Sequence, residues 1–456
     1  MGYIFNKPLK RIDKDVEADY KKGIAYFGLN KDVIFCKSCV ISNQRPNSEF
    51  EYNHKSDTKK RTIIFEDGLC QACKFAAIKK QEIDWDQREK ELRALCDKHR
   101  KSDGSYDCIV PGSGGKDSFF TSHMLQHKYG MTPLTITWAP NMYTPWGLKN
   151  MENWVNSGID NTLFSPNRRV QRLLTRLSLE NLLHPFQAFQ FGQKYLAPRI
   201  AMQHGVELIF YGEHMAEYGN SLEETKTPIM NESYFIEDNL DDFYAGGVSH
   251  SDLMDNYGLT SADLKHYKPL TSKEIGDFKI QVHYFGYYEP WHPQGNYYYS
   301  VEHGGFVTAP ERLSGVYTKY ASIDDKMEEF NYYTTGIKYG IGWTSFVSAF
   351  ESRSGDLTRE EAVALTKKYD IEFPETWIND FLEYVSLPSK EFPEASKHFE
   401  QPIIDRIYFD NLVDKFRSPH IWKLDGDKWS LRKSCWDDVV ESDNEIDTAS
   451  NWTGNK

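Results

Sequence analysis

A short loop with adjacent glycines carries the clearest chemical signal in this sequence. The run CIVPGSGGKDSFF, residues 108–120, passes from apolar residues into glycines, a lysine and an aspartate, and then becomes apolar again. Glycines let the backbone take positive φ and approach a ligand closely, so successive N–H groups converge on an anion at a helix N-terminus. An ordinary glycine turn that caps a helix is the alternative. We predict a phosphate cradle made of Ser113, Gly114, Gly115, Lys116, Asp117 and Ser118.

Two C-x-x-C pairs give a second chemical signal. Cys36 and Cys39 lie in CKSC, and Cys70 and Cys73 lie in CQAC. Four thiolates suit the tetrahedral coordination of Zn²⁺, and because sulfur would fill every position, no site remains for a reactive water. The pairs therefore predict a structural Zn²⁺ ion in a small knuckle module. An iron–sulfur cluster and a redox pair are alternatives for the same residues.

The segments around the loop alternate between strand-like and helix-like patterns. The strand-like runs are YDCIVPG, PLTITWAP, NTLFSP and VELIFYGEH, and the helix-like runs are FFTSHMLQHKYG, NMENWVNSG and RVQRLLTRLSLENLL. Such alternation is typical of βαβ units. The predicted fold class is α/β, a doubly wound parallel sheet with an N-terminal four-cysteine zinc-knuckle module and a mainly helical C-terminal region.

Local signals place several elements and boundaries. The spacing of Trp85, Leu92 and Cys96 predicts a helix over 84–100, Thr358 with Glu361 predicts a capping box, and Cys108 is expected in the core. The expected parts are an N-terminal extension (1–30), a zinc-binding module (31–83), the sheet domain (84–260), an aromatic-rich and helical substrate or partner region (261–440) and a flexible acidic tail (441–456).

Charge and composition disfavour several classes of partner. The chain has 54 basic and 67 acidic residues, a formal charge of -13, and no dense run of Lys or Arg, so binding of nucleic acid is not expected. No run approaches the ~18 apolar residues of a membrane span, and the first residues lack the pattern of a signal peptide. Seven cysteines, four of them in metal-type pairs, suit a reducing compartment. We expect a cytoplasmic protein.

The SGGKDS motif resembles the PP-loop of the N-type ATP pyrophosphatases, which cleave ATP between the α and β phosphates. The resemblance implies an adenine nucleotide alpha hydrolase-like domain that uses ATP and Mg²⁺. It implies that Ser113, Gly114, Gly115 and Ser118 hold phosphate oxygens, that Lys116 offsets charge on the leaving pyrophosphate, and that Asp117 orients the loop or binds Mg²⁺. Such stabilisation by prepositioned donors and a metal ion suits phosphoryl-type transition states.

Two further pairs of residues close predicted strands, where open α/β sheets place their ligands. Thr137 and Trp138 end one strand and are candidates to border the adenosine, although core packing is an equal alternative for Trp138. Gly212 and Glu213 end another strand, and Glu213 is a candidate to share Mg²⁺ with Asp117.

A wider set of motifs resembles the N-acetyl sugar amidotransferases of bacterial surface-polysaccharide and nonulosonic acid biosynthesis, including lipopolysaccharide O-antigen pathways. The motifs are the four-cysteine knuckle, Arg45-Pro46, GLCQAC, the PP-loop, YGEHMAEYGN, and the stretch from YTKYASIDDKMEEFNYYTTGIKYGIGWTSF to DLTREEAVALTKKYD, over about residues 34–375. The resemblance implies that ATP adenylates the carbonyl oxygen of a sugar N-acetyl group and that ammonia displaces AMP to leave an acetamidino group. The sugar-site candidates in this stretch are Lys319, Tyr320, Asp324, Asp325 and Lys326, with a solvated helix face as the alternative.

The source of ammonia is expected to lie outside this chain. Position 2 is Gly2, and Cys435 lies in RKSCWDD, so neither arrangement of a glutaminase nucleophile is present. The resemblance implies a separate glutaminase and a barrel-type subunit that delivers ammonia. Aromatic residues between Tyr284 and Tyr299, with His283 and His292, could stack on a nucleotide-linked sugar or simply pack. A PP-loop tRNA-modifying enzyme and a non-catalytic zinc scaffold are the competing functions.

Overall fold

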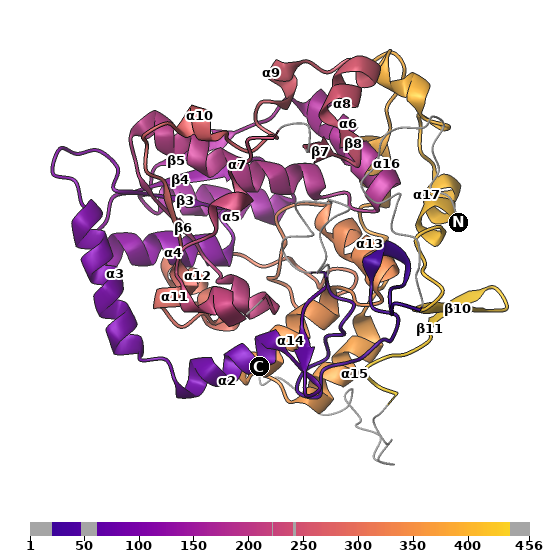
Figure 1. Ribbon diagram of the computed structural model, residues 1–456, viewed down its shortest axis with the longest axis horizontal. Coiled ribbons are helices and arrows are strands. Elements are labelled where there is room, and N and C mark those ends of the chain that lie inside the picture. Colours follow the sequence, from indigo (N-terminus) through magenta and orange to yellow (C-terminus); the bar gives the residue numbers. More distant parts are fainter. Residues whose placement is uncertain (1–20, 47–61, 221, 240–242, 438–456) are drawn as a thin grey trace.

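The computed structural model describes residues 21–46, 62–220, 222–239 and 243–437. Most of the expected N-terminal extension and the whole of the acidic tail, 441–456, lie outside the described residues. In Figure 1 the sheet and its helices occupy one side of the molecule, and the helices of the C-terminal region occupy the other. Helices α2 (Gln71–Gln81) and α3 (Trp85–His99) run along the edge and connect the two sides.

A five-stranded parallel sheet organises the first side. Its order is β5-β4-β3-β6-β9, and every neighbouring pair runs parallel. The strands are β3 (Cys108–Pro111), β4 (Pro133–Trp138), β5 (Asn161–Phe164), β6 (Leu208–Tyr211) and β9 (Gln281–Tyr284). All six residues of β4 are buried, as a parallel strand covered on both faces requires, and Cys108 is fully buried as predicted.

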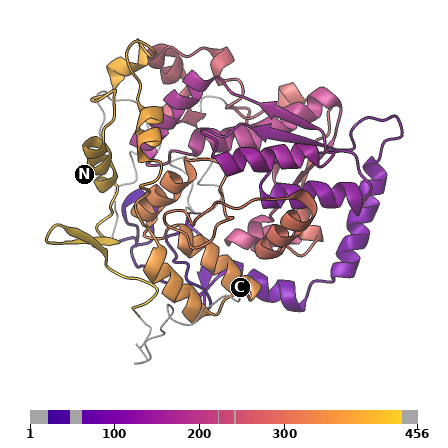
Figure 2. The same cartoon turned by 180° about the vertical axis from the view of Figure 1, so that it is seen from behind.

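Helices cover both faces of the sheet, which confirms the doubly wound fold. Helix α7 (Gln187–His204) packs on β3, β4 and β6 from one side, and α4 (Lys116–His127) packs on the same strands from the other. Helix α6 (Arg168–Leu182) extends the first layer, and α12 (Pro293–Gly304) lies against α4 in the second, which Figure 2 shows from behind. Helix α5 (Pro145–Asn156) also lies in the second layer.

The fifth strand lies beyond the boundary expected at residue 260. β9 follows Ile280 and pairs with β6 in the register Ile209↔Val282. Residues 228–230 bridge its other side, where the Met230 N–H donates to the carbonyl oxygen of Val282 at 2.8 Å. The aromatic segment around β9 carries no strand pattern of its own, so the sequence did not predict this strand. The same segment forms α11 (Phe285–Tyr288) and α12.

Helices and the knuckle module form the second side. The helices are α13 (Glu328–Tyr339), α14 (Trp343–Ser354), α15 (Arg359–Tyr369), α16 (Ile378–Val385) and α17 (Arg406–Asp414). The predicted capping box is confirmed, because Thr358 accepts the Glu361 N–H at 3.2 Å and Glu361 accepts the Thr358 N–H at 2.8 Å. Shorter elements are β1 (Phe65–Glu66), β2 (Leu69–Cys70), β7 (Tyr244–Ala245), β8 (Val248–Ser249), α8 (His250–Tyr257), α9 (Ser261–Leu264), α10 (Ser272–Ile275), β10 (Trp422–Asp425) and β11 (Lys428–Leu431).

The strand order creates a crevice at one point of the sheet. The chain steps outward from β3 to β4 and β5 and then returns to β6 on the other side of β3. The loops after β3 and β6 therefore diverge to opposite faces, and the carboxyl ends of these two strands flank a topological switch point, where open α/β sheets bind ligands. Within the described residues no helix combines the length and apolar character that a membrane span needs.

Candidate functional site

The loop after β3 owes its shape to its glycines. A Cβ on Gly112 would lie 2.1 Å from the Cβ of Ser118, and a Cβ on Gly114, which has φ of +84°, would lie 2.8 Å from the Cα of Met151. Gly115 is the N-cap of α4, and no side chain caps this end. The first N–H groups of a helix then face whatever anion occupies the loop. The sequence-predicted cradle is therefore a tight loop at the N-terminus of α4.

Helix α12 holds the charged residues of this loop. Lys116 forms an ion pair with Asp117 inside the loop. Asn296 donates from Nδ2 to Oδ1 of Asp117 at 3.0 Å, and the Ser300 hydroxyl donates to the carbonyl oxygen of Lys116 at 2.9 Å. The aromatic segment that the sequence linked to sugar binding thus supplies two polar contacts that orient the loop.

Glu213 follows β6 on the other side of the switch point. Burial and the nearby carboxylate of Asp117 raise the pKa of Glu213 to about 7, and the side chain is hydrogen-bonded to Tyr218. Mg²⁺ binds in proteins through one or two carboxylates and substrate phosphates. Asp117 and Glu213 are therefore the candidate carboxylate ligands for a magnesium ion at this point of the sheet.

A cavity of about 420 Å³ opens at the carboxyl ends of these strands. Four of the sequence-predicted residues line it, namely Ser113, Trp138, Gly212 and Glu213. Gly212 leaves room there, because a Cβ on this residue would lie 2.6 Å from the Trp291 ring. The cavity extends away from the sheet to the connection between α6 and α7 and to one face of α13.

The face of α13 closes this cavity, and although α13 lies within a motif of the sequence analysis, none of its residues was a site candidate. Its lining residues are Glu328, Asn331, Tyr332, Thr335, Lys338 and Tyr339. Their spacing of three, four and seven positions puts them on one side of a helix. Polar residues recurring at helical spacing in a stretch that also holds Phe330 and Ile337 are the signal that would have identified them.

Four cavity residues form a polar network. His184 Nε2 lies 3.0 Å from Oε1 of Gln190, and Asn331 is hydrogen-bonded to both His184 and Glu328. Burial and the charge of Lys338 lower the pKa of His184 to about 4, so its imidazole is neutral at neutral pH. Burial and the carboxylates of Asp324 and Asp325 raise the pKa of Glu328 well above its usual range. The network therefore presents mainly uncharged hydrogen-bonding groups.

Cations and aromatic rings complete the cavity wall. Lys338 donates to the carbonyl oxygen of Leu182 at 2.9 Å, and Lys194 Nζ lies 5.1 Å from the centre of the Tyr211 ring. The guanidinium of Arg45 lies 4.8 Å from the centre of the Phe346 ring. Neutral polar groups beside aromatic faces suit a sugar, and the cations suit an anionic substituent such as phosphate.

The two residues expected to border adenosine point in different directions. Trp138 is buried, lines the cavity, and packs so tightly on α7 that a Cβ on Gly192 would lie 2.1 Å from its ring. Thr137 is buried away from the cavity, where its hydroxyl accepts from Asn161 Nδ2 at 3.1 Å. Because successive strand residues face opposite sides of the sheet, both could not reach the same ligand.

Three of the five sugar-site candidates lie outside the cavity lining and make structural contacts. Lys319 is exposed and donates to the carbonyl oxygen of Pro310 at 2.7 Å. The Tyr320 hydroxyl donates to Glu351 at 2.8 Å, and Lys326 pairs with Asp380 at 2.8 Å. None of these three residues lines the cavity that contains Ser113.

The other two candidates, Asp324 and Asp325, lie next to the loop but also outside the cavity lining. Asp324 is hydrogen-bonded to the side chain of Ser113, and burial raises the pKa of its carboxyl. Asp325 accepts the N–H groups of Asn141 at 2.5 Å and Met142 at 3.1 Å. None of the five candidates therefore lines the cavity, which is lined instead by α13, the helix that follows them.

In the aromatic segment 284–299, Tyr284 lines the cavity. The two histidines that the sequence analysis named with this segment, His283 and His292, make structural contacts. His283 Nδ1 lies 2.8 Å from the Tyr288 hydroxyl, and His292 caps α12 by accepting the Gly295 N–H at 2.8 Å. Packing therefore accounts for both histidines.

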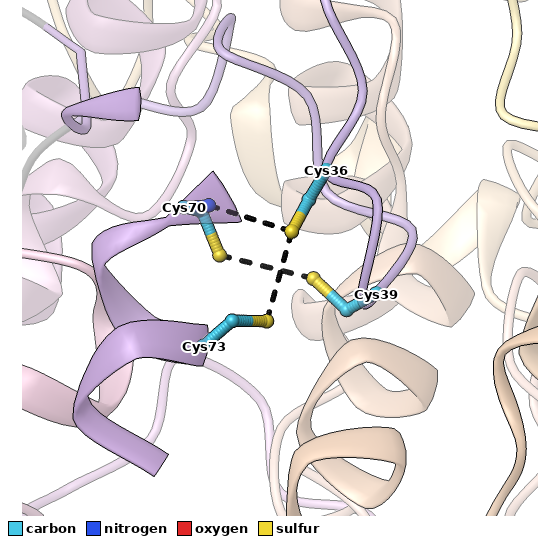
Figure 3. A group of neighbouring side chains, drawn as sticks. All are labelled: Cys36, Cys39, Cys70 and Cys73. Carbon is cyan, nitrogen blue, oxygen red and sulfur yellow. Dashed lines mark hydrogen bonds between the residues drawn. The ribbon is translucent and has the colours of Figure 1, made fainter. Parts of the chain in front are cut away.

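The four cysteines of the knuckle meet in one buried cluster, shown in Figure 3. The sulfur atoms of Cys36 and Cys73 lie 3.7 Å apart, and those of Cys39 and Cys70 lie 3.8 Å apart. A regular tetrahedron with Zn–S bonds of about 2.3 Å has S–S edges of about 3.8 Å. The Cys36 sulfur also accepts the N–H of Cys70 at 3.4 Å, as a thiolate would. The predicted cysteines therefore fit a single tetrahedral metal ion such as Zn²⁺.

Comparisons with known proteins locate one relationship in the C-terminal region. No curated protein matches the sequence. Among solved structures, an NMN synthetase from Francisella tularensis is similar at 12% identity and a TM-score of 0.21, over 28% of this chain and 54% of that one. The chain thus spans about half the length of that structure. Residues 314–435 match the family model of the C-terminal domain of WbpG-like LPS biosynthesis proteins. This matched region includes α13 and α14, and its similarity to WbpG-like LPS biosynthesis proteins fits the polysaccharide family that the sequence motifs resemble.

Proposed function

We propose that this chain is an ATP-dependent amidotransferase that converts the N-acetyl group of a sugar into an acetamidino group. The observation that carries the proposal is the cavity that connects Ser113 and Glu213, at the switch point, with the polar face of α13 in the WbpG-like region. Ser113 is the one residue of the 113–118 loop in the cavity lining, and it brings the loop to one end of the cavity, while the other end has groups that suit a sugar. A single cavity then holds both reactants of an adenylation.

The chemistry requires activation because an amide carbonyl is a poor electrophile and its oxygen is a very poor leaving group. In the first step the acetyl oxygen attacks the α phosphorus of ATP, the bond to the β phosphate oxygen breaks, and pyrophosphate leaves. In the second step ammonia attacks the former carbonyl carbon, AMP leaves with the oxygen, and one proton is released. Positioning the reactants in one site can supply ~7 to 11 kcal/mol of the barrier.

The residues of the loop have distinct parts in this scheme. The backbone N–H groups at the start of α4 hold the departing pyrophosphate, and Lys116 offsets its developing charge. Asn296 keeps Asp117 in place. Mg²⁺ bound by Asp117 and Glu213 would supply a positive charge against the phosphates.

The remaining cysteines favour this function over tRNA thiolation. Burial raises the pKa of Cys96 and of Cys435 to about 12, and it raises the pKa of Cys108 well above its usual range. A sulfur-transferring cysteine must form a thiolate and meet its substrate, which these three thiols do not. The -13 net charge also disfavours RNA. We propose a cytoplasmic enzyme that receives ammonia from separate glutaminase and barrel-type subunits.

An isotope experiment tests the reaction. The purified chain is incubated with ATP, Mg²⁺, a high concentration of ammonium and nucleotide-linked N-acetyl sugars whose acetyl oxygen is ¹⁸O, and products are followed by phosphorus NMR. The proposal predicts sugar-dependent AMP and pyrophosphate, with ¹⁸O in the AMP. Formation of ADP and phosphate, or AMP without the label, contradicts it.

Two controls keep the result specific to the loop and to the chain. Lys116→Ala should lower turnover by roughly 10² to 10³-fold, as loss of a group that stabilises transition-state charge does, while zinc content and melting temperature stay unchanged. Glutamine in place of ammonium should give no product, because the glutaminase is a separate subunit. Turnover with glutamine by the single chain would refute that part of the proposal.

A further inference from the structure

Arg353 is a buried arginine on α14 that lies beside the cysteine cluster. Arg353 is only 7% exposed, although arginine is seldom buried without charged partners. The preceding residue, Ser352, donates to the carbonyl oxygen of Ser38 at 3.4 Å, and Ser38 lies between Cys36 and Cys39. This end of α14 therefore lies beside the knuckle.

The hydrogen-bond donors of Arg353 are only partly used by the described residues. Nη2 donates to the carbonyl oxygen of Glu217 at 3.0 Å. Nε and Nη1 are buried and have no partner within the described part of the chain. The guanidinium carbon lies 5.0 Å from the centre of the Phe350 ring. Because leaving a buried charged donor without an acceptor is costly, Nε and Nη1 favour a negative charge nearby.

The metal site supplies the matching charge. Four thiolates and one Zn²⁺ carry a net charge of -2, because four negative charges exceed two positive ones. A buried charge of this size needs compensation from neighbouring cations and donors, and groups outside the ligand sphere commonly tune metal affinity. Arg353 offers a buried cation at the end of α14 that contacts the knuckle.

Helix α14 contacts the knuckle at two points. The Ser352 hydroxyl donates to the carbonyl oxygen of Ser38, between the first two cysteines, at 3.4 Å. Arg45, which follows the same pair, stacks on Phe346 of α14. Figure 1 shows α14 next to α2, and the two helices are in contact. Helix α14 therefore packs against the knuckle that carries the cysteines.

We propose that Arg353 is a positioning residue of the metal site, and that the site is shared between the N-terminal knuckle and the WbpG-like region. The guanidinium neutralises part of the charge on the metal–thiolate unit. Metal binding then stabilises the attachment of α14, and with it the position of α13 in the cavity. This inference does not depend on the reaction proposed above.

Zinc affinity of the full chain tests the proposal. Arg353→Gln keeps a polar side chain but removes the cation, and competition with a chromogenic chelator should show zinc affinity lowered by about 10 to 100-fold. In chain loaded with Co²⁺, the sulfur-to-metal charge-transfer band should shift, because the thiolates lose a neighbouring positive charge. A purely structural role for Arg353 would leave this band in place.

Arg417→Gln is the matched control. The side chain of Arg417 is 9% exposed, pairs with Asp414 and stacks on Trp422. Replacing it therefore removes a buried arginine from the same region without changing the neighbourhood of the cysteines. Its zinc affinity and cobalt spectrum should equal those of the parent chain. Arg353→Lys keeps the positive charge and should lose less zinc affinity than Arg353→Gln. If Arg353→Gln does not fold, Arg353→Lys still tests the proposal. The proposal would be overturned if folded Arg353→Gln kept zinc affinity within about twofold of the parent chain and an unshifted cobalt band.

Discussion

Asn296 on α12 donates its side-chain N–H to the Asp117 carboxylate on α4 over 3.0 Å, although 179 positions separate the two residues. The contact joins a segment without a recognisable binding motif to the loop that carries the clearest one. A carboxylate that is to bind a metal ion gains a fixed direction from such a partner, because one of its oxygens is already occupied.

Removing this contact should slow catalysis more than it lowers stability. We expect Asn296→Ala to reduce kcat for pyrophosphate release by about 10 to 100-fold, the usual effect of losing a group that orients a metal ligand, measured by a coupled pyrophosphate assay. Tyr298→Ala is the control, because Tyr298 is 60% exposed on the same helix. Equal kcat for Asn296→Ala and the parent chain would show that Asp117 needs no support.

Glu213→Gln should weaken the dependence on magnesium. The amide keeps the shape of the side chain but removes the negative charge that, with Asp117, forms the proposed magnesium site. We expect the Mg²⁺ concentration for half-maximal activity to rise by at least about tenfold, as loss of a metal-orienting group does, in titrations of pyrophosphate release. Glu223→Gln, on an exposed residue paired with Lys226, is the control. An unchanged Mg²⁺ requirement would remove Glu213 from the site.

Substitutions on α13 should distinguish the sugar from the nucleotide. Asn331→Ala breaks a network that includes His184 and Glu328, so the KM for the sugar should rise roughly tenfold, the effect of about 1.4 kcal/mol of lost binding, while the KM for ATP stays the same.

Lys319→Ala provides the comparison for this experiment, because Lys319 was the candidate of the sequence motif and is exposed outside the cavity. We expect its sugar KM to equal that of the parent chain, measured in the same initial-rate assay. The reverse outcome, with Lys319→Ala impaired and Asn331→Ala unaffected, would assign the sugar site to the segment before α13.

Removal of one cysteine ligand should release zinc and destabilise the fold. Cys73→Ser should lose most of its zinc by elemental analysis and melt at a lower temperature, because binding of structural zinc contributes free energy to folding. Cys96→Ser is the matched control, since Cys96 is a fully buried thiol outside the cluster and should keep its zinc. Full zinc content in Cys73→Ser would show that the cluster is not a four-sulfur site.

Much of this architecture follows from local sequence. The apolar run at 108–111 followed by Gly112 and Gly114 needs a strand and a tight turn, and the structure has both. Thr358 and Glu361 are close in sequence and form their capping box as predicted. The two C-x-x-C pairs were recognisable because metal chemistry restricts both residue type and spacing.

Tertiary structure decided which residues share a site. Asn331, His184 and Gln190 meet only because α13 packs beside the α6–α7 connection, and Arg353 lies near the knuckle only because α14 packs on it. A sequence records spacing along one chain, and it therefore predicts turns, caps and helical faces. Contacts between distant segments depend on how whole elements pack, a balance of burial and charge compensation summed over the molecule, which no short motif contains.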